Sequence, residues 1–212
     1  MKTDLTDITV VLDRSGSMQS CQMEAQNGLN HFIKEQKALP GNAIFSLVQF
    51  DTVYEFVYRG VPISTVGDFT LVPRGMTALL DAVGRAINET GERLKNLAED
   101  DRPGLVVFVI VTDGLENSSH EFKKSQIKEM ITRQQEIYHW QLTFLGANQD
   151  AFAEANALGI AASATVNYVS GKLAEAFASA SNNIARMRGM SSTGGVVSNS
   201  YTENERKGMT ND

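Results

Sequence analysis

The chain has 212 residues, of which 42% are hydrophobic, and this is enough for one domain with a sizeable core. Its formal net charge of −6, without a basic cluster that contains aromatic residues, argues against nucleic acid as the main partner. The single cysteine, the polar N-terminus and apolar runs far shorter than the roughly 20 residues that cross a bilayer favour a soluble, cytoplasmic protein that does not bind membranes. We also expect a monomer.

Strand-like and helix-like periods alternate along the chain. We expect strands at 5–12, 43–50, 53–59, 105–112, 140–145 and 164–169. We expect helices from about 17 to 39, from 79 to 97, around 127–134, from 148 to 159 and from 173 to 189. Residues 1–189 would form one domain, and the polar segment 190–212 would be a tail that is either flexible or docked. Within the tail, residues 200–205 could cap one helical turn.

Two of these strands indicate the kind of sheet. Every residue of 105–111 is apolar, which is typical of a central parallel strand covered on both faces. The strand 53–59 follows 43–50 with almost no loop, so the two form an antiparallel hairpin, and Pro62 favours an edge position. The predicted fold class is α/β: a doubly wound, mostly parallel six-stranded sheet with one antiparallel edge strand and helices on both faces.

Oxygen-bearing side chains follow the first and fourth strands of this sheet. Asp13, Ser15 and Ser17 come directly after the run 8–12, and Asp113 follows 105–112. The carboxyl ends of neighbouring parallel strands are where ligands bind in open α/β sheets, and Thr77, just before a helix, could reach the same point. Five hard oxygen donors would then converge, as Mg²⁺ prefers, and Mn²⁺ would suit the same oxygens.

Each of these residues also has a simpler interpretation. Ser17 and Thr77 could be helix N-caps, and Asp113-Gly114 could be a turn. The occurrence of all of them at adjacent strand ends favours metal binding over these separate explanations.

The whole pattern resembles the von Willebrand factor type A (VWA) domain with an intact metal-ion-dependent adhesion site. The resemblance rests on Asp-x-Ser-x-Ser after the first strand, a Thr at the head of a middle helix and Thr-Asp-Gly after the fourth strand, and it covers roughly residues 5–189. It implies that Asp13, Ser15 and Ser17 hold Mg²⁺, that Thr77 binds it directly or through water, and that Asp113 acts mostly through water.

This ligand set would leave the metal with positive character and one replaceable position. If only Asp13 coordinates directly as an anion, an Asp or Glu side chain of a partner protein can complete the octahedron. Residues around the five ligands are candidates for the rim of the site or for hydrogen bonds to the ligands: Arg14, Asp51, Gly75, Gly114 and Glu116. Arg14 could help to select the partner, and Arg74 is either solvated or also faces an acidic partner. Asn148, Gln149 and Asp150 follow another strand and could lie near the same end of the sheet.

The motifs of an enzyme are missing from the sequence. It has no Gly-x-x-x-x-Gly-Lys phosphate loop and no Gly-x-Ser-x-Gly elbow, and its three histidines, His31, His120 and His139, are scattered. We therefore expect a non-enzymatic, Mg²⁺-dependent protein-binding module, an intracellular adaptor similar to stand-alone bacterial or phage VWA proteins. One alternative is a component of a stress-response, tellurite-resistance or AAA+ ATPase-linked complex. An alternative of another class is a metal-dependent phosphohydrolase.

Overall fold

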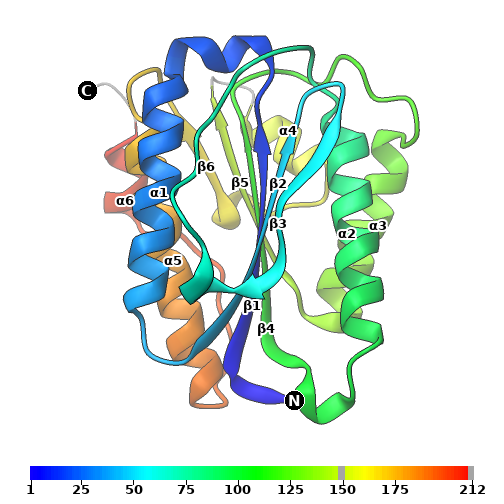
Figure 1. The fold of residues 1–212 in the computed structure, drawn as a ribbon, viewed down its shortest axis with the longest axis vertical. Helices are drawn as coiled ribbons and strands as arrows, with labels where there is room; N and C mark the ends of the chain where they lie inside the picture. The colour runs from blue at the N-terminus through cyan, green and yellow to red at the C-terminus, as the bar shows by residue number, and fades with distance from the viewer. Residues whose placement is uncertain (148–150, 210–212) are drawn as a thin grey trace.

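The computed structural model describes residues 1–147 and 151–209 of the chain. Its centre is a six-stranded sheet with the strand order β3-β2-β1-β4-β5-β6 (Figure 1). The strands are β1 (Lys2–Asp13), β2 (Asn42–Phe50), β3 (Tyr54–Pro62), β4 (Pro103–Thr112), β5 (Gln141–Ala147) and β6 (Thr165–Tyr168). Only β3 runs antiparallel to its neighbour, and it lies at one edge. The predicted fold class is therefore confirmed.

Helices cover both faces of the sheet, as Figure 1 shows. The helices are α1 (Gln22–Ala38), α2 (Leu79–Lys95), α3 (Lys124–Tyr138), α4 (Ala151–Ala157), α5 (Leu173–Ser192) and α6 (Glu203–Lys207). One hydrophobic cluster joins the sheet to α1 and α5, and a second joins it to α2, α3 and α4. The molecule thus has three layers, with the sheet in the middle.

The central strand β4 explains why the two clusters form. Its side chains alternate between them, because successive residues of a strand point to opposite faces. The residues that belong to the α1–α5 side are Leu105, Val107, Val109 and Val111, and those on the α2–α3 side are Val106, Phe108 and Ile110. This buried, two-sided strand lies beside β1, so the ends of β1 and β4 meet at the upper end of the sheet in Figure 1.

Several helix boundaries differ from the sequence prediction by a few residues, and two of them have a visible cause. The first helix was expected from about residue 17, but a 3₁₀ turn spans Gly16–Cys21 before α1 begins, because Met18 bonds back to the Ser15 carbonyl. The last helix was expected to end at Gly189 and continues instead to Ser192. A helix tolerates an interior glycine at a cost of about 1 kcal/mol, and here the last turns are fixed by Arg188, which donates to the carbonyls of Gln36 and Pro40.

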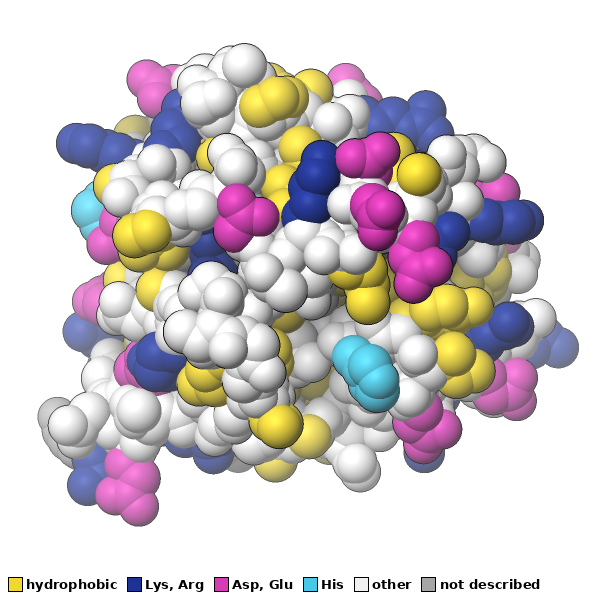
Figure 2. Space-filling model, turned by 90° about the horizontal axis from the view of Figure 1, so that it is seen from below, with side chains coloured by type: hydrophobic (Ala, Val, Ile, Leu, Met, Phe, Trp, Pro, Cys, Tyr) yellow, Lys and Arg dark blue, Asp and Glu magenta, His cyan; other side chains and the backbone are white. Residues whose placement is uncertain are grey.

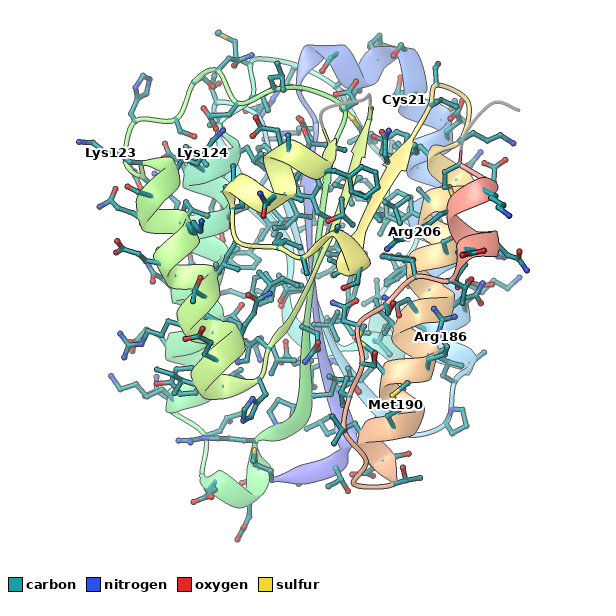
Figure 3. All side chains as sticks on the ribbon, turned by 180° about the vertical axis from the view of Figure 1, so that it is seen from behind. Cys21, Lys123, Lys124, Arg186, Met190 and Arg206 are labelled. Atoms are coloured by element: carbon teal, nitrogen blue, oxygen red, sulfur yellow. The ribbon has the colours of Figure 1, made fainter. Side chains whose placement is uncertain are left out.

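The described part of the C-terminal segment, residues 193–209, lies against β5, β6 and α5. Tyr201 is 5% exposed and Met209 is 2% exposed, and both belong to the α1–α5 cluster. Thr202 caps α6 through a reciprocal bond with Glu205, as its sequence predicts. Figure 3 shows α6 beside α5, where Arg186 pairs with Glu205 at 2.8 Å.

No helix in residues 1–147 and 151–209 is both long and apolar enough to cross a membrane. The end opposite the ends of β1 and β4, seen in Figure 2, carries acidic and basic side chains that are interspersed around its edge.

Candidate metal centre

The candidate metal centre lies where β1 and β4 end. Leu12 pairs with Val111 in the parallel ladder, so the chain emerges from both strands at the same level of the sheet. Asp13 is the last residue of β1, and Asp113 follows the last residue of β4. The structure thus brings together the two carboxylates that the sequence placed at adjacent strand ends.

Asp13 forms the floor of the centre. Its side chain is fully buried, with one oxygen accepting from the Ser15 amide at 2.6 Å and the other from the Thr112 hydroxyl at 2.7 Å. Burial, aided by the charge of Asp113, raises the pKa of Asp13 to about 6, although the bonds from Thr112 and Ser15 oppose this shift. The site therefore holds an anion in a place where a positive charge would stabilise it.

A chain of hydroxyls connects the floor to the solvent. The Oγ atoms of Ser15 and Ser17 lie 3.0 Å apart, and the Ser17 hydroxyl donates to Asp113 Oδ1 at 2.6 Å. Burial raises the pKa of Asp113 too, against the hydrogen bond from Ser17. Ser15 is buried, Ser17 is exposed and Asp113 is half-buried, so the centre is open on the Ser17 side.

Thr77 reaches the same point from a third loop. Its amide donates to Asn117 Oδ1 at 2.9 Å, and its carbonyl accepts from the amides of Asn117 and Ser118, so its backbone is clamped. A Cβ on Gly114 would lie 3.4 Å from both Ser17 Oγ and Thr77 Oγ1, which shows that the two hydroxyls border one small space. The described helices begin without a side-chain cap from either hydroxyl. Neither hydroxyl is therefore used as a helix cap, and that of Ser17 bonds to Asp113 instead.

A buried ion pair holds two of these loops together. Arg14 is 4% exposed, and its guanidinium donates to Asp51 at 3.0 Å and to Glu55 at 2.9 Å. Asp51 also accepts from Arg74 at 2.8 Å and from the Val53 amide at 2.5 Å. Burial alone would raise the pKa of Asp51, but these bonds and the charges of both arginines hold it below its usual value.

The placement of Arg14 differs from one expectation of the sequence. We expected Arg14 to help to select a partner, but its side chain points into the loop layer, because Asp51 and Glu55 bind it there. Arg74, whose side chain is 57% exposed, is the arginine that reaches the surface beside the centre. Gly75 follows it with a φ of +70°, and its carbonyl accepts from the Gly16 amide.

Glu116 stabilises the loop after β4, and its carboxylate bonds within that loop and to the start of α2. Its carboxylate accepts from the amides of Leu80, Ser118 and Ser119 and from the Ser119 hydroxyl, with distances of 2.7 to 2.9 Å. These bonds attach the loop to the N-terminus of α2, where a negative charge is favourable. Glu116 is thus a neighbour of the centre with its hydrogen-bonding capacity already used.

Sequence reasoning missed the role of Thr112, which orients Asp13, although the Thr-Asp-Gly motif contains this residue. Asn117 follows the Asp113 turn, and its position in the sequence suggested the rim of the site; in the structure its side chain clamps the Thr77 amide. Residues 148–150, which were expected near this end of the sheet, lie outside the described residues.

The donor set fits a small, hard divalent cation. It offers two carboxylates and three hydroxyls, all oxygen, and the groups that hold the Asp13 anion are neutral donors. In the part of the chain that the structure describes, no three His, Cys, Asp or Glu side chains form a cluster, so the candidate site is of a different, hydroxyl-rich kind. The ligands that the sequence pattern named would be Asp13, Ser15, Ser17, Thr77 and Asp113.

Comparisons with known proteins support the fold. No family model matches the chain, and no curated protein matches it. Among solved structures, proximal thread matrix protein 1 from the mussel byssus is 16% identical, with a TM-score of 0.59 over 85% of this chain and 46% of that protein. A von Willebrand factor type A protein from Catenulispora acidiphila is also 16% identical, with a TM-score of 0.54 over 88% of this chain and 42% of that one.

A third solved structure, the manganese-loaded TRAP protein of Plasmodium vivax, is 14% identical, with a TM-score of 0.56 over 84% of this chain and 74% of that chain. The chain spans less than half the length of the mussel and Catenulispora proteins. At these identities the likeness concerns the fold, and it agrees with the strand order described above. The chain therefore has the fold of a von Willebrand factor type A domain.

Proposed function

We propose that this chain is a non-enzymatic protein-binding module that recruits an Asp or Glu side chain of a partner through a bound divalent cation. One observation carries the proposal: a buried carboxylate, Asp13, lies below hydroxyls from two loops and a second carboxylate, in a centre that is open at Ser17. Asp13, Ser15 and Ser17 would hold the metal, with Thr77 and Asp113 binding directly or through water.

The choice of ligands explains why the centre would recruit an acid. Hydroxyls and waters fill coordination positions without neutralising the ion, so a cation that is bound directly by one carboxylate keeps net positive charge. Mg²⁺ is the favoured ion, and Mn²⁺ suits the same oxygens. The manganese-loaded state of the TRAP protein supports this for a chain of similar fold.

The arrangement favours binding over catalysis. Ser15 and Ser17 would be engaged as ligands, which makes them poor nucleophiles, so we propose no hydrolytic step. The single cysteine, Cys21, is buried, which suits a reducing compartment such as the cytoplasm. We propose a monomeric adaptor there, acting on proteins rather than on nucleic acid or membranes.

Metal-dependent capture tests this function. Immobilised wild-type chain should retain a partner in Mg²⁺ and release it in EDTA, and Ser17→Ala should capture less, because an exposed ligand is lost without disturbing the core. Ser64→Ala removes another exposed hydroxyl far from the centre and should behave as the wild type. Identification of the retained protein separates an ATPase-linked complex from a stress-response complex. The proposal would be refuted if the partner were captured equally well in EDTA and by Ser17→Ala as by the wild type in Mg²⁺. It would also be refuted if the chain turned over a phosphoester and Ser15→Ala abolished this turnover.

A further inference from the structure

A pocket adjoins the candidate metal centre on the side of β5 and α4. Thr112, Asp113 and Gly114 form one of its walls, so the pocket and the metal centre share the loop that carries Asp113. Its volume is about 120 Å³. A partner chain whose carboxylate reached the metal would therefore pass directly beside this pocket.

The rest of the lining is mostly apolar. Leu115 stands at the mouth and is 60% exposed, while Phe144 and Ala151 are buried below it. Gly146 keeps the floor closed, because a Cβ there would come within 2.6 Å of Phe144 Cε1 and 2.8 Å of the Ala151 Cβ. An exposed leucine above a closed apolar floor is a surface that gains from being covered.

Among the described lining residues, Glu154 is the one charged side chain other than Asp113, and it already has a partner. Glu154 of α4 pairs with Lys124 at 2.9 Å, and Figure 3 shows Lys124 at the start of α3. A cationic side chain therefore has little to gain here, and an uncharged apolar one fits the lining.

The geometry points to this pocket as the specificity pocket of the partner-binding site, which takes an aliphatic side chain within two residues of the partner's acidic residue. The inference rests on the proposed function, since the metal must hold that carboxylate. The size is suitable, because an apolar cavity of about 150 Å³ admits a benzene molecule. Residues two apart in an extended peptide lie on the same side, about 6.5 Å from each other, and the pocket shares Asp113 with the metal centre, so one peptide segment can present both side chains.

A positional peptide library tests the inference. Peptides of the form Xaa-Xaa-Asp-Xaa-Xaa, with every position but the Asp varied, are sorted on the wild-type chain in Mg²⁺ and again in EDTA. We expect Leu, Ile, Val or Met to be enriched about tenfold over Gly at one of the varied positions, as burial of one aliphatic side chain provides.

Two variants and a control connect this preference to the pocket. Ala151→Leu adds bulk to the lining from α4, on the same side of the sheet as Phe144, and Leu115→Ser removes the exposed wall without touching the core. Both should lose the aliphatic preference and keep Mg²⁺-dependent selection of Asp peptides. Ala153→Leu adds the same bulk at an exposed position of α4 outside the pocket, and it should keep the wild-type preference.

The outcomes separate this inference from the proposed function. Mg²⁺-dependent selection without an aliphatic preference would refute the role of the pocket in specificity but not the proposed function. A preference that survives in both pocket variants would do the same. No Mg²⁺-dependent selection by the wild type overturns the proposed function and the pocket with it.

Discussion

The substitution Asp51→Asn tests how the loops of the centre are held. Asp51 is almost fully buried and accepts hydrogen bonds from Arg14, Arg74 and the Val53 amide. Asparagine has nearly the same shape and can still accept from Val53, but it lacks the negative charge. The change therefore removes the main counter-charge of Arg14 while leaving the packing of the loop almost unchanged.

The expected loss of stability follows from the exposure of each partner. Removing one member of a buried ion pair costs about 3–5 kcal/mol, whereas an exposed pair contributes about 0–1 kcal/mol. Arg14 is buried but keeps its bond to Glu55, whose side chain is half exposed, and Arg74 is mostly exposed. We therefore expect Asp51→Asn to lower the free energy of unfolding by about 2–3 kcal/mol, between these two limits.

Urea denaturation at neutral pH measures this loss, with Glu55→Gln as the matched control. Glu55 bonds the same arginine from the surface, so its neutral variant should lose less than about 1 kcal/mol. Equal losses in the two variants, or a loss below about 1 kcal/mol for Asp51→Asn, would refute the idea that this buried pair holds the loops.

Three further predictions concern the C-terminal segment and the loop geometry. Tyr201→Ala should lower the free energy of unfolding by about 3–4 kcal/mol in urea, because the buried ring leaves a cavity, and a loss below about 1 kcal/mol would contradict the docking of residues 193–209. Burial would raise the pKa of Glu205, but Arg186 and the Thr202 amide hold it below its usual value. The charged Glu205 side chain therefore stabilises the folded state fully above about pH 4.5, and this stabilisation is lost as the pH falls through the lowered pKa. The stability gap between the wild type and Glu205→Gln should therefore shrink as the pH falls from about 6 to about 3, and a constant gap would exclude this linkage. Gly75→Ala should lower the free energy of unfolding more than Gly194→Ala does, and it should also weaken Mg²⁺ binding. Both glycines have a φ of +70°, but only at Gly75 would a Cβ crowd Asp51, at 3.1 Å. Equal effects of the two substitutions in calorimetry would contradict this prediction.

The arrangement of the sheet could be predicted because its signals are local. The apolar run 105–111 marked a strand with two covered faces, and the short connection before 53–59 required a hairpin. Together these two observations place a parallel centre and an antiparallel edge. The oxygen donors were found for the same reason, because each follows directly after a strand or precedes a helix.

The interactions that hold the centre could not be predicted, because they join residues far apart in the sequence. Arg14 meets Asp51 and Glu55 across separations of 37 and 41 residues, so nothing near Arg14 indicates that it is buried. The extra turn of α5 has a similar cause, since Arg188 is fixed by Gln36 and Pro40 in another part of the chain. From the sequence alone, Gly189 predicts the end of the helix, because the distant partners of Arg188 that extend it are not visible there.

Thermal unfolding with added Mg²⁺ tests most directly whether Asp13 and the neighbouring hydroxyls bind a divalent cation. At a Mg²⁺ concentration about 100-fold above Kd, binding to the folded state adds about 2.7 kcal/mol, which for a chain of this length raises Tm by about 5–10 °C. The wild type and Ser64→Ala should show this rise, and Asp13→Asn should not. A Tm of the wild type that neither Mg²⁺ nor Mn²⁺ changes, or an equal rise in Asp13→Asn, would contradict the metal centre.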